Sequence, residues 1–145
     1  MIYRLIYSSE ATRQLSNEDL KEILITSRKN NEPAHITGSL AYVDGIFIQI
    51  LEGEKDKVKS LADKIKRDGR HASFKVIYES ETEDRVFGAW DMSCVRPSAR
   101  EMADWVKLDG TSKIAEVLLT LESRPDVLPE FVASVVKKTA TLPWF

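Results

Sequence analysis

The sequence has one cysteine and two histidines among its 145 residues. A single cysteine, Cys94, cannot form an internal disulfide, and His35 and His71 are too few for a convincing metal site. No Gly-rich dinucleotide fingerprint and no pairing of a nucleophile with a base stands out along the chain. We therefore expect no bound metal and no enzymatic turnover.

Long apolar runs and an excess of one charge sign are also missing. The 21 basic and 23 acidic residues leave a formal charge of −2, too little for a strong attraction to nucleic acid. The first seven residues include Arg4 and are too short for the apolar part of a signal peptide, and no apolar run reaches membrane-spanning length. We expect a cytoplasmic protein with no nucleic-acid and no membrane partner.

The chain does contain primary amides in unusual places. Asn30 and Asn31 stand where a helix should end, and Gln49 lies inside the apolar run 47–51. A buried amide is costly unless its donors and its acceptor find partners. Together with Tyr7 from the first apolar run, these amides suggest a pocket that binds a planar ligand with hydrogen-bonding edges.

Before about residue 97, patterns typical of strands and helices alternate. The expected elements are a strand over 2–8, a helix that begins after Ser16 and stops near Asn30, strands over 37–43 and 46–51, a helix around 58–65, and strands over 74–79 and 90–95. Ser16 and Asp19 have the spacing of a capping box at the first helix start. The order βαββαββ predicts an α+β fold with both helices on one face of the sheet.

The dipeptide Asp44-Gly45 predicts a two-residue hairpin turn and with it a register. Val43 should lie opposite Ile46, and Leu40 opposite Gln49. One face of the hairpin then carries Gly38, Leu40, Tyr42, Phe47, Gln49 and Leu51, and the other carries Ile46, Ile48 and Ile50. We interpret Gly38 as leaving room for a flat ligand.

After Pro97 the pattern is wholly helical, which suggests a division into residues 1–96 and 97–145. Two apolar stripes, within 114–121 and 128–136, are too narrow to form a core of their own. We expect them to dock on the sheet face that carries Ile46, Ile48 and Ile50. The apolar end, 142–145, should be held on the domain or in an oligomer contact.

Five segments resemble BLUF domains, blue-light sensors that use flavin, in order and spacing. These are Tyr3–Ser9, Asn30–Gly38, Phe47–Gly53, Asp68–His71 and Phe87–Met92. The resemblance covers residues 1 to about 96 and implies a ferredoxin-like βαββαββ sandwich. The remaining residues resemble the C-terminal two-helix extension of short, stand-alone members and leave no room for an effector domain.

The resemblance implies a photoreceptor rather than an enzyme. FAD, or else FMN, would bind non-covalently between the two helices. Light would rearrange hydrogen bonds around Tyr7, Gln49 and the flavin, a partner protein would read the change, and the protein would form a homo-oligomer. Two alternatives stay open from the residues alone: a ferredoxin-like interaction module without a light response, and a small flavin oxidoreductase.

The resemblance also implies roles for single residues. The photoactive positions are Tyr7, Gln49, Trp90 and Met92, with either Trp90 or Met92 packed near Gln49. The cofactor-binding positions are Ile23, Ser27, Asn30, Asn31, Gln49, Lys64, Asp68, Arg70 and His71. Each has a plainer interpretation: core packing for the apolar and aromatic positions, a helix C-cap for one asparagine, and solvated charge for the rest. Lys64 stands where arginine is more usual, which would keep a phosphate partner and lose its bidentate geometry.

Overall fold

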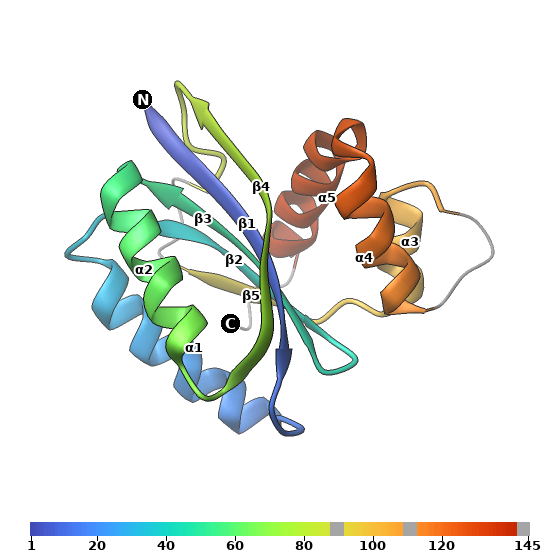
Figure 1. Ribbon diagram of the computed structural model, residues 1–145, viewed down its shortest axis with the longest axis horizontal. Coiled ribbons are helices and arrows are strands. Elements are labelled where there is room, and N and C mark those ends of the chain that lie inside the picture. The colour runs from blue at the N-terminus through green and yellow to red at the C-terminus, as the bar shows by residue number, and fades with distance from the viewer. Residues whose placement is uncertain (88–91, 109–112, 142–145) are drawn as a thin grey trace.

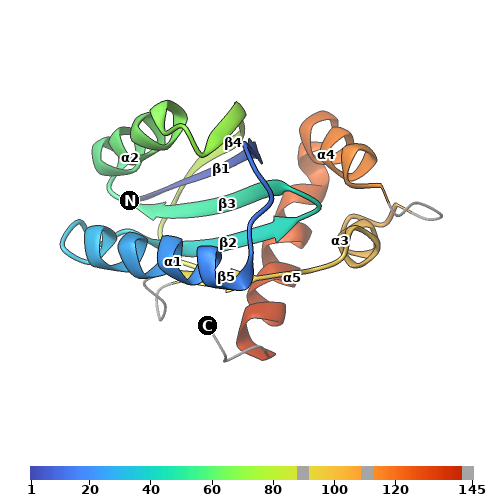
Figure 2. The same cartoon turned by 90° about the horizontal axis from the view of Figure 1, so that it is seen from below.

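The structure is a computed structural model that describes residues 1–87, 92–108 and 113–141, the side chains of 139–141 excepted. A five-stranded sheet lies at its centre, with helices on both faces (Figures 1 and 2). In chain order the elements are β1 (Ile2–Ala11), α1 (Asn17–Asn31), β2 (Thr37–Val43), β3 (Ile46–Gly53), α2 (Lys55–Arg67), β4 (His71–Thr82), β5 (Ser93–Val95), α3 (Ala99–Trp105), α4 (Ile114–Ser123), a 3₁₀ turn (Pro125–Val127) and α5 (Leu128–Thr141).

The strands lie in the order β4-β1-β3-β2-β5. Every neighbouring pair is antiparallel except β2 and β5, which are parallel. This arrangement confirms the α+β, ferredoxin-like prediction. Strands β1 and β4 are longer than expected because their pairing with each other continues to Ala11 and His71. The described part of β5 begins only at Ser93, and Trp90 lies outside the described residues.

The local signals at the ends of α1 and β2 have clear structural counterparts. The Ser16 hydroxyl accepts from the Asp19 amide at 3.2 Å, and the Asp19 carboxylate accepts from the Ser16 amide at 2.9 Å, so the capping box is confirmed. Asp44 and Gly45 both have positive φ, at 49° and 77°, as a type I′ turn requires. The hairpin register, with Leu40 opposite Gln49, is also confirmed.

Gly38 serves a different purpose from the one expected. A Cβ at Gly38 would lie 1.8 Å from the carbonyl oxygen of Ile50, on the neighbouring strand. The close approach of the two backbones therefore requires glycine at this position. The interpretation that Gly38 leaves room for a ligand was wrong.

Helices α1 and α2 cover one face of the sheet, and α4 and α5 cover the other, here called the tail face, with α3 packed against α4 and α5 (Figure 2). On the tail face Ile48 and Ile50 belong to the same buried cluster as Val117, Leu121 and Phe131. Helix α3 precedes the two expected helices. Its seven residues are too few to show an apolar stripe, although Ser98 and Glu101 form a capping box there.

Among the described residues, no helix is long and apolar enough to cross a bilayer.

Candidate ligand pocket between helices α1 and α2

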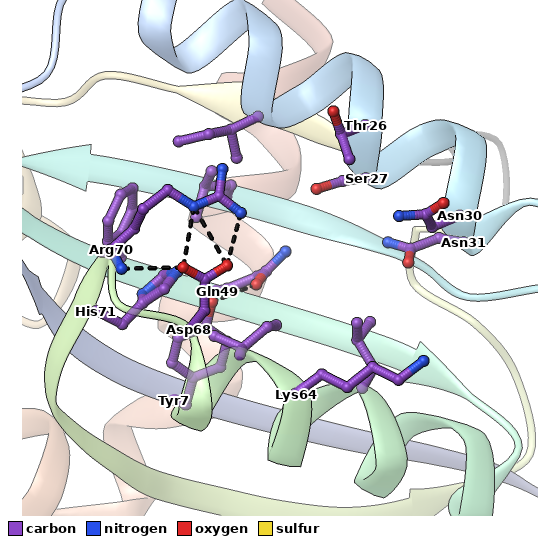
Figure 3. A pocket seen from close by; sticks show the side chains of 15 residues that line it. Tyr7, Thr26, Ser27, Asn30, Asn31, Gln49, Lys64, Asp68, Arg70 and His71 are labelled. Atoms are coloured by element: carbon purple, nitrogen blue, oxygen red, sulfur yellow. Dashed lines mark hydrogen bonds and ion pairs between the residues drawn. The ribbon is translucent and has the colours of Figure 1, made fainter.

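A cavity of about 170 Å³ lies between α1, α2 and the sheet (Figure 3). It is lined by Tyr7, Ile23, Thr26, Ser27, Asn30, Asn31, Leu40, Phe47, Gln49, Leu61, Lys64, Ile65, Asp68, Arg70 and His71. The structure thus brings together all nine residues predicted to bind a cofactor, and Tyr7 with them. They come from β1, α1, β3, α2 and the turn into β4, which the fold places around one space.

Gln49 forms the polar part of the cavity floor. Its side chain is buried, and its Oε1 accepts a hydrogen bond of 2.5 Å from the Tyr7 hydroxyl. The two residues face each other across the β1–β3 pair. The Nε2 of Gln49 donates to the Sδ of Met92 at 3.3 Å. A thioether is a weak acceptor, so the donor end of this amide is held less firmly than its acceptor end.

Tyr7 is fixed in place by aromatic neighbours. Its ring stacks on Phe74 with 4.6 Å between centroids, and the ring of His71 meets it edge-on at 6.3 Å. Burial, and secondarily the negative charge of Asp68, raises the pKa of Tyr7 above its usual value. The hydroxyl therefore stays protonated at neutral pH and can donate to Gln49.

Asn31 carries an amide that needs a partner. The residue is only 3% exposed, and its backbone carbonyl accepts from the amides of Ala34 and Ile36. Within the described part of the chain, its side chain makes no hydrogen bond although it lines the cavity. Because these amide atoms open onto the cavity, they are placed to exchange hydrogen bonds with water or with a ligand there.

The structure also decides against one of the alternatives for the asparagines. The residue that caps the α1 C-terminus is Glu32, which has right-handed backbone angles. The non-glycine residue with left-handed angles nearby is His35, not Asn30 or Asn31. Neither asparagine therefore serves as the left-handed C-cap that the sequence allowed.

An ion pair stands at the mouth of the cavity. The guanidinium of Arg70 donates to both carboxylate oxygens of Asp68, the shortest contact being 2.7 Å (Figure 3). These hydrogen bonds lower the pKa of Asp68 to about 2. Beside them, His71 Nδ1 lies 2.7 Å from the Ser9 hydroxyl, and burial lowers the pKa of the imidazole. His71 is therefore neutral at physiological pH.

A second cavity, of about 540 Å³, adjoins the first. The two share Asn30, Asn31, Leu61 and Lys64. The second adds Lys57, Ser60 and Asp56 around an apolar base of Ala34 and Ile36. Ligand sites usually measure roughly 300 to 1,000 Å³. The two cavities together can therefore take a ligand with a ring system at one end and an anionic chain at the other.

Sequence reasoning missed one residue that holds the pocket together. Arg28 of α1 donates from Nε to the carbonyl oxygen of Met92 at 2.8 Å. This bond joins the helix that lines the cavity to the start of β5. No local pattern marks Arg28 in the sequence, because its partner is a backbone atom 64 residues away. Of Trp90 and Met92, Met92 contacts Gln49, while Trp90 lies outside the described residues.

The family model described as "Sensors of blue-light using FAD", or BLUF, matches residues 2–93. The alpha subunit of photoactivated adenylate cyclase from Euglena gracilis is 34% identical over 139 residues, which is 96% of this chain and 12% of that protein. The beta subunit from Euglena longa is 32% identical over the same length and 14% of its own. The chain thus spans about an eighth of the curated relatives it matches.

Solved structures of similar fold include proteins of this chain's own size. The photo-activated state of BlsA is 28% identical, with a TM-score of 0.80 over 94% of this chain and 95% of that one. A bacterial light-regulated adenylyl cyclase is 34% identical, with a TM-score of 0.65 over 90% of this chain and 36% of its own.

Proposed function

The chain belongs to the BLUF family of flavin-binding blue-light sensors, and on that premise we propose that light changes the hydrogen bonds joining Tyr7, Gln49 and the flavin. Family membership confirms the resemblance seen in the five sequence segments. It takes the place of the two alternatives left open by the sequence, an interaction module without a light response and a small flavin oxidoreductase. Two points are proposed below: which residues respond to light, and how the change at the pocket is passed to a partner protein.

The observation that supports this mechanism most strongly is the setting of the Gln49 amide. Its oxygen accepts from Tyr7 and its nitrogen donates to the weak acceptor Met92 Sδ. Flavin supplies absorption of blue light and a site that takes an electron and a proton. Tyr7, held neutral by burial, would be the donor of both when flavin is bound. Rotation of the Gln49 amide would then exchange the donor and acceptor that it offers to Tyr7, to Met92 and to the cavity.

The cavity residues fit a flavin. The unpaired amide of Asn31 matches the alternating donors and acceptors on the polar edge of the ring system, and Ile23 and Leu61 supply apolar contacts for its faces. Ser27 and Asn30 would add hydrogen bonds at the rim, while Asp68, Arg70 and His71 would border the ring and sugar chain at the mouth.

We propose FAD as the cofactor, with FMN as the alternative. Lys64 lies where the two cavities meet, and Lys57 and Ser60 extend the polar rim from there. Phosphate groups leaving the first cavity would meet these side chains. Fluorescence titrations with riboflavin, FMN and FAD should show tighter binding of the phosphorylated forms, and Lys64→Gln should reduce that gain. Equal affinities for all three flavins would contradict this assignment.

We further propose that the output is signalling to a separate partner protein, without turnover by this chain. Related proteins named as light-regulated cyclases support a role in controlling an effector. A cytoplasmic location and self-association belong to the same proposal. The apolar residues 142–145, which lie outside the described residues, are expected to be held either on the domain or in a contact between copies.

Two substitutions test the proposed mechanism. Tyr7→Phe keeps the ring and removes the hydroxyl, and Gln49→Leu removes the amide at nearly constant volume. Both variants should retain flavin, yet neither should form the normal red-shifted state under blue light. Absorption spectra before and after illumination check this. A normal light-induced shift in either variant would exclude that residue from the mechanism.

A further inference from the structure

Glu52 is a buried carboxylate in β3, a strand whose other buried polar side chain is Gln49. It is 0% exposed and lies on β3, three residues after Gln49. Side chains alternate along a strand, so Glu52 points to the tail face while Gln49 points into the pocket. A buried charge is retained only with strong compensation, and the partners of Glu52 show what it holds.

Arg4 supplies the opposite charge. It faces Glu52 across the β1–β3 pair and donates from Nε and Nη2 to Oε2, at 2.9 and 2.8 Å. The Arg4 side chain is only 12% exposed, so water screens the pair little. This pair fixes the carboxylate on the central strands of the sheet.

The remaining bonds of Glu52 reach the connection between β4 and β5. The backbone amide of Val86 donates to both carboxylate oxygens at 3.0 Å, and that of Phe87 donates to Oε1 at 2.7 Å. Arg85 Nη1 also donates to the backbone carbonyl of Glu52 and to Thr37 Oγ1, each at 2.9 Å. Three successive residues are thereby attached to Glu52 and its neighbouring strand.

The attachment of residues 85–87 matters because the chain continues from there to Met92, beside Gln49. Phe87 is fully buried in the tail-face core. After residues 88–91, which lie outside the described residues, Met92 contacts Gln49 through its sulfur and Arg28 through its carbonyl. One end of this short connection is thus held by Glu52, and the other end contacts the amide that responds to light in the proposed mechanism.

We propose that Glu52 is a positioning residue of the photosensory site: by holding residues 85–87 it determines how Met92 is presented to Gln49, and so sets the stability of the lit state. This inference rests on the proposed function. If it holds, a side chain outside the pocket controls how fast the lit state returns to the dark state.

The test is the rate of dark recovery after a blue-light pulse, measured by absorption of the flavin-loaded protein. Glu52→Gln keeps the shape of the side chain, but its amide nitrogen cannot accept from Arg4, Val86 or Phe87. Because residues 85–87 are then held less firmly, the recovery rate should change by about tenfold. Glu52→Asp, which keeps both oxygens on a shorter stem, should give a rate closer to wild type.

A matched control separates positioning from simple loss of stability. Leu15→Ala removes a buried side chain of the other core, away from residues 85–87, and should lower the melting temperature without changing recovery beyond about twofold. If Glu52→Gln does not fold, Arg85→Gln at the partly exposed Arg85 tests the same connection, and its recovery rate should also change several-fold.

The outcomes distinguish this inference from the proposed function. A wild-type protein without a light-induced shift would overturn the proposed function itself. A normal wild-type shift, with Glu52→Gln and Arg85→Gln recovering at the rate of Leu15→Ala, would overturn only the role of Glu52.

Discussion

The polar side chains of Asn31, Gln49 and Tyr7 distinguish this pocket from an ordinary hydrophobic core. Their burial alone would be unfavourable for the two amides. Gln49 is compensated within the protein by Tyr7 and Met92, whereas the side chain of Asn31 has no such partner in the described part of the chain. The first residue can therefore respond within the protein, and the second is best suited to retaining a ligand.

Asn31→Ala should weaken flavin retention. One hydrogen bond to the ligand is lost, worth about 1 kcal/mol net, so the dissociation constant should rise about fivefold. Fluorescence titration with FAD measures it, and Asn30→Ala at the exposed neighbouring position is the control, with a smaller effect. Equal effects of the two substitutions would show that Asn31 has no special role.

The photoresponse should not follow the titration of an ordinary tyrosine. Burial raises the pKa of Tyr7 above the usual value of about 10, so the hydroxyl stays protonated on both sides of that pH. The amplitude of the light-induced shift should therefore be the same at pH 7 and at about pH 10. A loss of amplitude with a midpoint near pH 10 would mean that Tyr7 ionises like an exposed tyrosine.

Single residues were predicted from the sequence where they broke a pattern. An amide in the apolar run of β3 stands out, and the register then places Leu40 and Phe47 on the same face. Glu52 comes directly after the same run but was given no role, because its partners at residues 85–87 are brought to it only by the fold. Arg28 could not be recognised for the same reason.

At the scale of elements, the β2–β3 hairpin and the start of α1 were the most predictable parts. Both are specified by adjacent residues, the Asp44-Gly45 turn and the Ser16 capping box. The lengths of β1 and β4 were underestimated, since their ends depend on pairing between distant strands. The short α3 was missed because a seven-residue helix shows no periodicity.

The hairpin supplies a sharp test of packing. Gly38→Ala would bring a Cβ to within 1.8 Å of the Ile50 carbonyl oxygen, so one of the two strands must move. We expect a loss of about 3 kcal/mol in the free energy of unfolding, measured by denaturant titration. Gly69→Ala, where an added Cβ meets no atom within 4 Å, should change it by less than about 0.5 kcal/mol. A small effect at Gly38 would contradict the described register.

At the scale of the whole molecule, the sheet is shared by two cores. The pocket face holds Tyr7 and Met92, and the tail face joins Ile48 and Ile50 to helices α4 and α5. The connection before β5 touches both, through Phe87 on one side and Met92 on the other. Its position makes it the candidate link from pocket to tail, which measurements on the tail helices can test.

Hydrogen exchange tests whether the tail carries the output. Under continuous blue light, amides in 92–138 should exchange faster than in darkness, because a changed Met92 contact alters how β5 and the tail helices pack. Gln49→Leu, which lacks the responding amide, is the control and should show no difference between light and dark. Identical exchange in the wild-type protein under both conditions would exclude the tail as the output element.

The most direct test of a flavin-binding blue-light sensor is the absorption spectrum of the purified protein before and after blue light. We predict a yellow protein with the bands of oxidised flavin, a small red shift on illumination, and full return in darkness. A protein that stays colourless after flavin is supplied, or one whose bound flavin shows no reversible shift, would contradict the account.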